Sequence, residues 1–232
     1  DAILGDARRA ELLTQLQMPQ AEILTEAAYR AQYKGYRQIK GVQKNSTTET
    51  YFKLRARLSS TRFADVPIVI EGGKRLGNAK KEIVVTFRHP EPCLCPGGRH
   101  FKNRLIFHIG PREGITIQFW SKKPGLKLAL EERTFEFLFR DLRRNLQYVE
   151  EYEKLLLDCI SGDQTLFVST DEVRAMWKFT DPIVAAWQNN KIPLRTYAPD
   201  SNEPLTESTT LVENDVERAQ RSSGQPPLRR EI

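Results

Sequence analysis

Short segments in which apolar and polar residues alternate occupy most of the chain between residues 51 and 139. The stretch YFKLRARLS alternates strictly, with apolar side chains on one side and Lys53, Arg55 and Arg57 on the other, so we expect a strand with one wet or interfacial face. The same period or a short apolar run recurs in PIVIEG, EIVVTF, RLIFHIG and GITIQFW, and a further strand pair is expected in LKLAL and TFEFLF. Strands at such close spacing predict a single broad, mainly antiparallel β-sheet.

The remaining patterned segments follow a helical period instead. VEEYEKLLLDCISGD has an apolar stripe and ends at Gly162, a natural C-terminal cap. STDEVRAMWKFTDPIVAAW begins with Ser169 and Glu172 at capping-box spacing, and Asp6 can cap an earlier helix in ARRAELLTQLQ. Helices that cover one face of a large sheet predict an α+β fold.

The end of the chain differs in composition from the rest. From residue 189 onward it has five prolines, many Ser, Thr and Glu residues and few apolar anchors. We therefore expect residues 1–188 to form the folded domain and residues 189–232 to be an extended or disordered tail.

The charge balance argues against a nucleic-acid partner. The net charge is +6, but 36 Lys and Arg residues are interleaved with 30 Asp and Glu residues, which is typical of a mixed surface. Three cysteines are too few for a disulfide framework and fit a reducing cytosol, so a cytoplasmic location is expected. No apolar run reaches the roughly 18 to 20 residues that a membrane span requires.

A basic loop with three glycines joins two of the expected strands. In EGGKRLGNAKK, glycine allows close approach of the backbone while four cations supply positive charge, so the loop could hold an anion. The functional hypothesis is a phosphate clamp in which Lys74 donates from the end of a strand. The alternative is a solvated hairpin turn, because exposed Lys and Arg residues are common.

Other motifs carry little chemistry. The chain contains neither GxGxxG nor GxxxxGK[ST], so it has no dinucleotide or P-loop fingerprint. Cys93, Cys95 and His100 resemble a zinc cluster only loosely, because a second cysteine pair is missing, and no metal is expected. For His108, a local hydrogen bond within a strand is favoured over a role as general base.

Seven fragments, in their order along the chain, resemble the C-terminal domain of glucose-6-phosphate dehydrogenase over residues 6 to 188. The fragments are RAQY, KGYRQIKGVQKNSTTETY, FADVPIVIEGGKRL, RLIFHIGPREGITIQF, SKKPG, YEKLLLDCISGDQTLF and STDEVRAMWKFTDPI. The resemblance implies an enzyme whose N-terminal Rossmann domain binds NADP and whose C-terminal domain helps to hold glucose 6-phosphate and forms a homodimer or tetramer through its sheet. A histidine takes the hydroxyl proton while a hydride passes to the nicotinamide, giving 6-phosphogluconolactone in the oxidative pentose phosphate pathway.

The resemblance also assigns individual residues. Lys74 falls on the family lysine at the substrate, and Lys80, one step after Ala79, stands near a second family cation, so both are expected to bind substrate. His108 and Gly110 replace a family arginine and glutamine, and an additional NADP site found in some members is not expected. The family's histidine motif has no counterpart, so no catalytic residue is expected here and this chain alone should be inactive.

Two other functions stay open at this point. One is a non-catalytic, stand-alone module that dimerises or regulates through the same sheet, which the replacements at His108 and Gly110 favour. The other is nucleic-acid binding, which would be steeply salt-dependent and lacks an evident stacking platform.

Overall fold

The computed structural model describes residues 2–18, 27–63, 66–89, 95, 101–139 and 151–212, and these form two compact units. Unit 1 comprises Asp1–Asn78 and Glu150–Ile232, and unit 2 comprises Ala79–Val149. Within the described residues, no helix combines the length and the apolar character needed to cross a bilayer.

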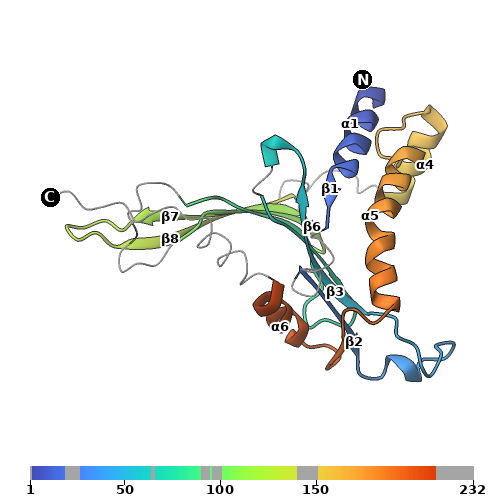
Figure 1. Cartoon of the computed structure of the whole chain (residues 1–232). Helices are drawn as coiled ribbons and strands as arrows, with labels where there is room; N and C mark the ends of the chain where they lie inside the picture. The colour runs from blue at the N-terminus through green and yellow to red at the C-terminus, as the bar shows by residue number, and fades with distance from the viewer. Residues whose placement is uncertain are drawn as a thin grey trace. The chain divides into compact units, whose positions relative to one another are not determined.

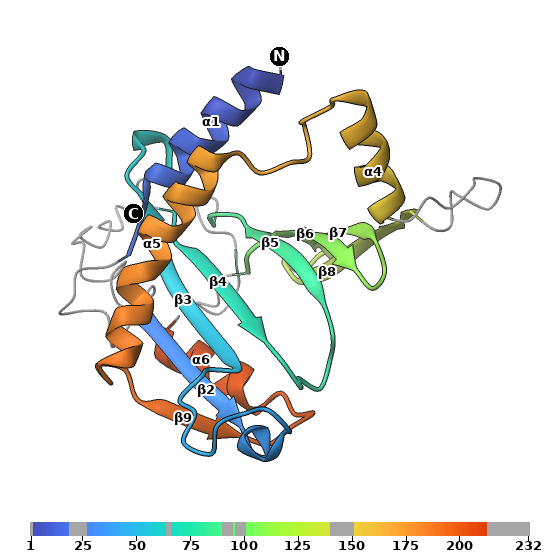
Figure 2. The same ribbon diagram turned by 90° about the vertical axis from the view of Figure 1, so that its right-hand side faces the viewer.

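Unit 1 contains a five-stranded sheet with helices on both of its faces (Figures 1 and 2). Its strands pair in the order β1-β3-β2-β9, and β4 pairs with the free side of β3; β2 and β9 run parallel and the other pairs antiparallel. The strands are β1 (Leu16–Gln17), β2 (Ala28–Tyr33), β3 (Tyr51–Leu58), β4 (Ile68–Gly73) and β9 (Leu194–Tyr197). The helices are α1 (Ala2–Thr14), α4 (Glu151–Ser161), α5 (Thr170–Gln188) and α6 (Glu203–Val212), with short 3-10 turns at Tyr36–Gln38 and Thr61–Phe63.

The two faces of this sheet have different cores. On one face, Ile183 and Trp187 of α5 pack with Ala28 of β2 and Leu54 of β3. On the other face, a cluster of tyrosines that includes Tyr51 packs against α6, which lies behind β2 and β3 in Figure 2. Of the three β3 cations expected on a wet or interfacial face, Lys53 and Arg55 are only 3% and 8% exposed, whereas Arg57 is exposed. Lys53 is covered by α6, where its ammonium group donates to Oγ1 of Thr209.

Unit 2 is an antiparallel sheet of four strands in sequential order. The strands are β5 (Lys81–Thr86), β6 (Arg104–Gly110), β7 (Gly114–Lys122) and β8 (Leu130–Leu138). The register places Ile83 beside Phe107, and Ile117 beside Phe135, so apolar side chains collect on one face because alternate residues share a side.

The expected α+β fold with mainly antiparallel pairing is confirmed, and so are several local details. Ser169 and Glu172 form a complete capping box at the start of α5, and Gly162 after α4 has the left-handed φ of 71° that favours glycine.

Five expectations differ from the structure. Helices lie on both faces of the unit 1 sheet rather than on one, because α6 packs on the face opposite to α5. The strands form two sheets rather than one; LKLAL lies in the β7–β8 connection except for Leu130; and α1 begins at Ala2, before the cap expected at Asp6. Part of the expected tail is ordered, because residues 194–197 form β9 and residues 203–212 form α6. The apolar residues Ile192, Tyr197 and Leu205 hold this segment on the sheet, although they are too widely spaced to give a local pattern. The tail beyond 212 lies outside the described residues.

Candidate functional site

Lys74 lies immediately after β4, with its side chain exposed and its backbone fixed at both ends. Its N–H donates to the carbonyl oxygen of Thr50 at 2.8 Å. Its own carbonyl oxygen accepts a hydrogen bond of 2.6 Å from the hydroxyl of Tyr197. The ammonium group is therefore presented to solvent from a backbone position that has little freedom to move.

The glycine before Lys74 is required by close packing. A Cβ added at Gly73 would lie 2.7 Å from Cδ2 of Tyr51 and 2.9 Å from Cδ1 of Leu76, both below the distances that real Cβ atoms adopt. Gly73 is not among the glycines with positive φ, so its role is steric: it lets an aromatic ring and a leucine approach the strand end. Gly73 therefore serves the packing of the strand end rather than recognition of a ligand.

The residues after Lys74 are joined to the segment that follows β9. Arg75 donates from Nε to Oδ1 of Asp200 at 2.7 Å and from its terminal nitrogen to Oδ2, forming a bidentate ion pair. The backbone N–H of Asp200 donates to the carbonyl oxygen of Arg75 at 2.6 Å. The Arg75 guanidinium lowers the pKa of the Asp200 carboxyl, and the same pairing raises the pKa of Arg75, so both side chains stay charged. Arg75 therefore serves structure, whereas Lys74 has no ion-pair partner among the residues that the structure describes.

Tyr197 anchors this arrangement from inside the core. Its side chain is fully buried, and its hydroxyl lies 3.0 Å from Oγ1 of Thr50 in addition to its bond to Lys74. Burial raises the pKa of Tyr197, so the hydroxyl remains protonated and can donate. The rings of Tyr33 and Tyr51 each lie 6.2 Å from the Tyr197 ring in edge-to-face geometry.

Lys80, the second predicted substrate ligand, lies in unit 2 just before β5. Its ammonium group is 2.6 Å from Oε1 of Glu82, which already neutralises its charge. An anion would have to compete with this carboxylate for Lys80. The two predicted ligands thus differ, because Lys74 presents its charge without such a neighbour among the described residues.

The remaining candidates have structural partners. Nε2 of His108 lies 2.8 Å from Oγ1 of Thr116 on the neighbouring strand, so the expected local hydrogen bond is confirmed. Sγ of Cys95 lies 2.9 Å from Nε2 of His89, whereas Cys93 and His100 lie outside the described residues. Across the described ranges, no three potential metal ligands from His, Cys, Asp and Glu gather at one point.

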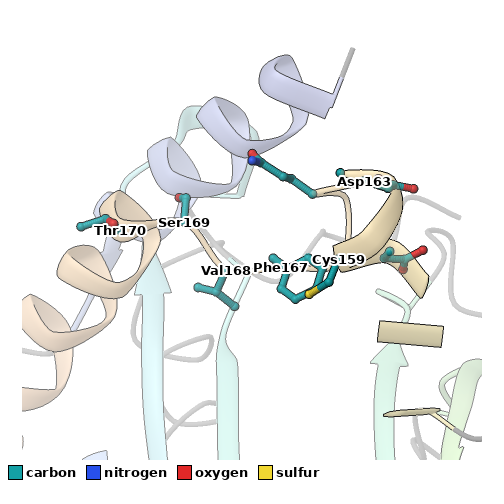
Figure 3. A pocket seen from close by; sticks show the side chains of 9 residues that line it. Cys159, Asp163, Phe167, Val168, Ser169 and Thr170 are labelled. Atoms are coloured by element: carbon teal, nitrogen blue, oxygen red, sulfur yellow. The ribbon is translucent and has the colours of Figure 1, made fainter. Parts of the chain in front are cut away.

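A pocket of about 410 Å³ lies between α4 and the start of α5. Figure 3 shows the side chains of Cys159, Phe167 and Val168 at its wall. Its two carboxylates are engaged locally: Lys154 pairs with Asp158, and the N–H and hydroxyl of Thr165 donate to Asp163. The hydrogen bond from the hydroxyl of Thr165 also lowers the pKa of Asp163. The pocket therefore presents no pair of free acid and base groups.

Sequence reasoning places Lys74 at the end of a strand, where the structure has it, but misses the residues that hold its backbone. Thr50, Tyr197 and Asp200 stand in no recognisable motif, and Tyr197 lies 123 positions beyond Lys74. The one sequence feature that points to them is weak: Ile192 and Tyr197 are apolar residues inside a segment whose composition is otherwise typical of a tail.

Comparison with known proteins places this arrangement in a family. Residues 6–219 match the family described as "Glucose-6-phosphate dehydrogenase, C-terminal domain". The glucose-6-phosphate 1-dehydrogenase of Aggregatibacter actinomycetemcomitans is 43% identical over 152 residues, which are 65% of this chain and 30% of the relative. That of Chlamydia trachomatis is 34% identical over 189 residues, which are 78% of this chain and 42% of the relative. The chain thus spans about a third of the length of such relatives.

Solved structures show the same fold. The glucose-6-phosphate 1-dehydrogenase of Mycobacterium avium superposes with a TM-score of 0.69 at 26% identity, covering 86% of this chain and 41% of that one. A glucose-6-phosphate dehydrogenase in complex with its substrate glucose-6-phosphate gives a TM-score of 0.75 at 23% identity, covering 86% and 42%, a likeness that concerns the fold. The chain belongs to the glucose-6-phosphate dehydrogenase family of oxidoreductases, in which it corresponds to the C-terminal domain.

Proposed function

We propose that this chain is the substrate-binding and dimerisation part of an enzyme that oxidises glucose 6-phosphate to 6-phosphogluconolactone with NADP. A Rossmann domain would supply the dinucleotide-binding site and the histidine that takes the proton, since residues 1–232 contain neither a dinucleotide-binding motif nor the family's histidine motif. The enzyme would be located in the cytoplasm and would act in the oxidative pentose phosphate pathway. The family membership and the length of the relatives support this proposal.

The observation that carries the proposal is the exposed ammonium group of Lys74 on a backbone bonded to Thr50 and Tyr197. A phosphate is bound better by a cation whose backbone is held before binding, because only the side chain then loses conformational entropy when the contact forms. Lys74 is therefore the first ligand assigned to the sugar phosphate. Lys80 is a second candidate, weakened by its bond to Glu82.

The apolar face of unit 2 supports association between two copies of the chain. Five large side chains on this face are 37% to 67% exposed: Ile83, Phe107, Ile117, Phe135 and Phe137. Contiguous apolar surface of this kind typically marks an interaction site, and most homo-oligomers pair identical surfaces about a two-fold axis. We therefore assign this face to the dimer interface expected from the family.

Steady-state kinetics of Lys74→Ala in the full-length protein that contains this chain tests the site. Loss of a charged hydrogen bond of about 1.5–3 kcal/mol should raise KM for glucose 6-phosphate about 10- to 100-fold. The value of kcat should fall less, because the phosphate is remote from the carbon that loses the hydride. An unchanged KM would remove Lys74 from the site.

A further inference from the structure

The turn that carries Lys74 is connected to the segment 197–201 along its whole length. The Tyr197 hydroxyl donates to the carbonyl oxygen of Lys74, and the N–H of Asp200 donates to that of Arg75. The N–H of Gly77 donates to the carbonyl oxygen of Ser201 at 3.1 Å. Lys74, Arg75 and Gly77 are therefore held, in that order, by Tyr197 at the end of β9 and by Asp200 and Ser201 just after it.

The conformation of the turn requires such support. Arg75 has a φ of 53°, in the left-handed region that residues other than glycine seldom occupy. A backbone conformation of this kind persists only where surrounding contacts enforce it. The contacts that enforce it come from Tyr197 and Asp200, so the direction in which Lys74 leaves the strand depends on them.

The two supporting contacts differ in strength. The ion pair of Arg75 with Asp200 is on the surface, with side chains 53% and 61% exposed, and solvent weakens such pairs. The Tyr197 hydroxyl is buried, and its loss would leave the Lys74 carbonyl oxygen without that donor in a region with little water. Tyr197 is therefore the stronger of the two supports.

We propose that Tyr197 is a positioning residue for substrate binding: it fixes the backbone of Lys74 so that the ammonium group is held ready for the phosphate of the sugar. This inference rests on the proposed role of Lys74. It adds a residue that lies in the core and does not touch substrate, and it assigns to the end of β9 a part in the substrate site.

Tyr51 provides a matched control. It is equally buried in the same cluster, and its hydroxyl lies 2.6 Å from Oγ of Ser208 on α6 rather than at Lys74. Replacing either tyrosine by phenylalanine removes one buried hydroxyl and keeps the ring. Any difference between Tyr197→Phe and Tyr51→Phe therefore reports the contacts of the Tyr197 hydroxyl with Lys74 and with Thr50, the residue whose carbonyl oxygen accepts the Lys74 N–H.

The experiment compares Tyr197→Phe, Tyr51→Phe, Lys74→Ala and the double variant Lys74→Ala/Tyr197→Phe in the full-length protein. Tyr197→Phe should raise KM for glucose 6-phosphate about 2- to 10-fold with kcat nearly unchanged, as loss of one neutral hydrogen bond allows. Tyr51→Phe should lower the melting temperature by a similar amount and leave KM unchanged. The double variant should have the KM of Lys74→Ala, because a positioning residue has nothing left to position.

Amide hydrogen exchange of the peptide around Lys74 gives a second readout that needs no turnover. Exchange there should be faster in Tyr197→Phe and unchanged in Tyr51→Phe; if Tyr197→Phe does not fold, Asp200→Asn is measured in the same way and should also exchange faster. The inference is overturned if both phenylalanine variants change KM and exchange alike, or if the double variant is additive. A normal KM for Lys74→Ala would instead overturn the proposed role of Lys74 on which this inference rests, so the two failures are distinguishable.

Discussion

Arg9 of α1 donates from Nε to Oε1 of Glu172 at 2.7 Å, joining the first helix to the start of α5. The other carboxylate oxygen of Glu172 accepts the backbone N–H of Ser169, so one side chain completes the capping box and receives the ion pair. The terminal nitrogens of Arg9 donate to the carbonyl oxygens of Thr165 and Phe167. This network fixes the turn that precedes α5.

The Arg9–Glu172 contact should make stability depend on pH. The hydrogen bond from Arg9, followed by that from Ser169, lowers the pKa of Glu172 from 4.5 to about 2. Because the folded pKa is depressed, the stabilisation is complete above pH 4.5 and is lost as the pH falls towards 2. Glu172→Gln should therefore lower the urea midpoint at pH 7, and its difference from the wild type should shrink by pH 3.

Arg174→Ala is the control for this measurement. Arg174 pairs with Asp171 on the same helix, but both side chains are more than three-quarters exposed, so the pair should contribute little. A Glu172→Gln difference that stays constant between pH 7 and pH 3 would contradict the account.

The buried cation of β3 leads to a second prediction. The ammonium group of Lys53 lies 3.2 Å from Oε2 of Glu71 on β4 and donates to Oγ1 of Thr209 on α6 at 2.9 Å. Removing Glu71 leaves a charge in the core, so Glu71→Leu should lower the free energy of unfolding by about 1–3 kcal/mol, less than for a fully buried pair. The double variant Lys53→Met/Glu71→Leu should recover most of this loss. Chemical denaturation measures the free energy of unfolding of both variants. A double variant that is less stable than Glu71→Leu would contradict this prediction.

The apolar face of unit 2 leads to a third prediction. Phe135 is 67% exposed on this face, whereas its neighbour Thr134 points to the opposite face of β8. Phe135→Glu should weaken dimerisation of the full-length protein at least about tenfold, because it brings a charge into an apolar interface. Thr134→Glu should not. Sedimentation equilibrium measures both, and equal association of the two variants would exclude this face as the interface.

The sequence pattern predicts those strands and helix ends that depend only on residues close together in the chain. The strands β3 to β7 coincide with the segments that show a two-residue period or a short apolar run. The capping box at Ser169 and the end of α4 at Gly162 need only neighbouring residues, so they are visible in the sequence.

Contacts distant in sequence account for what the pattern misses. Strand β2 is buried on both faces although it contains Arg30 and Gln32, so its sequence shows no alternation. Arg30 is accommodated because its Nε donates to the carbonyl oxygen of Ile192 at 2.8 Å, a partner 162 positions away. The hydrogen bond from Tyr197 to Lys74 likewise joins residues that are far apart in the sequence. Lys74 itself can be found because glycine, cation and strand end lie together, but the contacts that hold it depend on the tertiary fold.

The most direct test of the Lys74 assignment compares glucose 6-phosphate with glucose as substrates of the full-length protein and of Lys74→Ala. An ammonium group that binds the phosphate should matter only for the phosphorylated sugar. Lys74→Ala is therefore expected to lower kcat/KM for glucose 6-phosphate about 10- to 100-fold and to leave kcat/KM for glucose unchanged. An equal loss for both sugars, or no loss for either, would contradict the assignment of Lys74 to the phosphate.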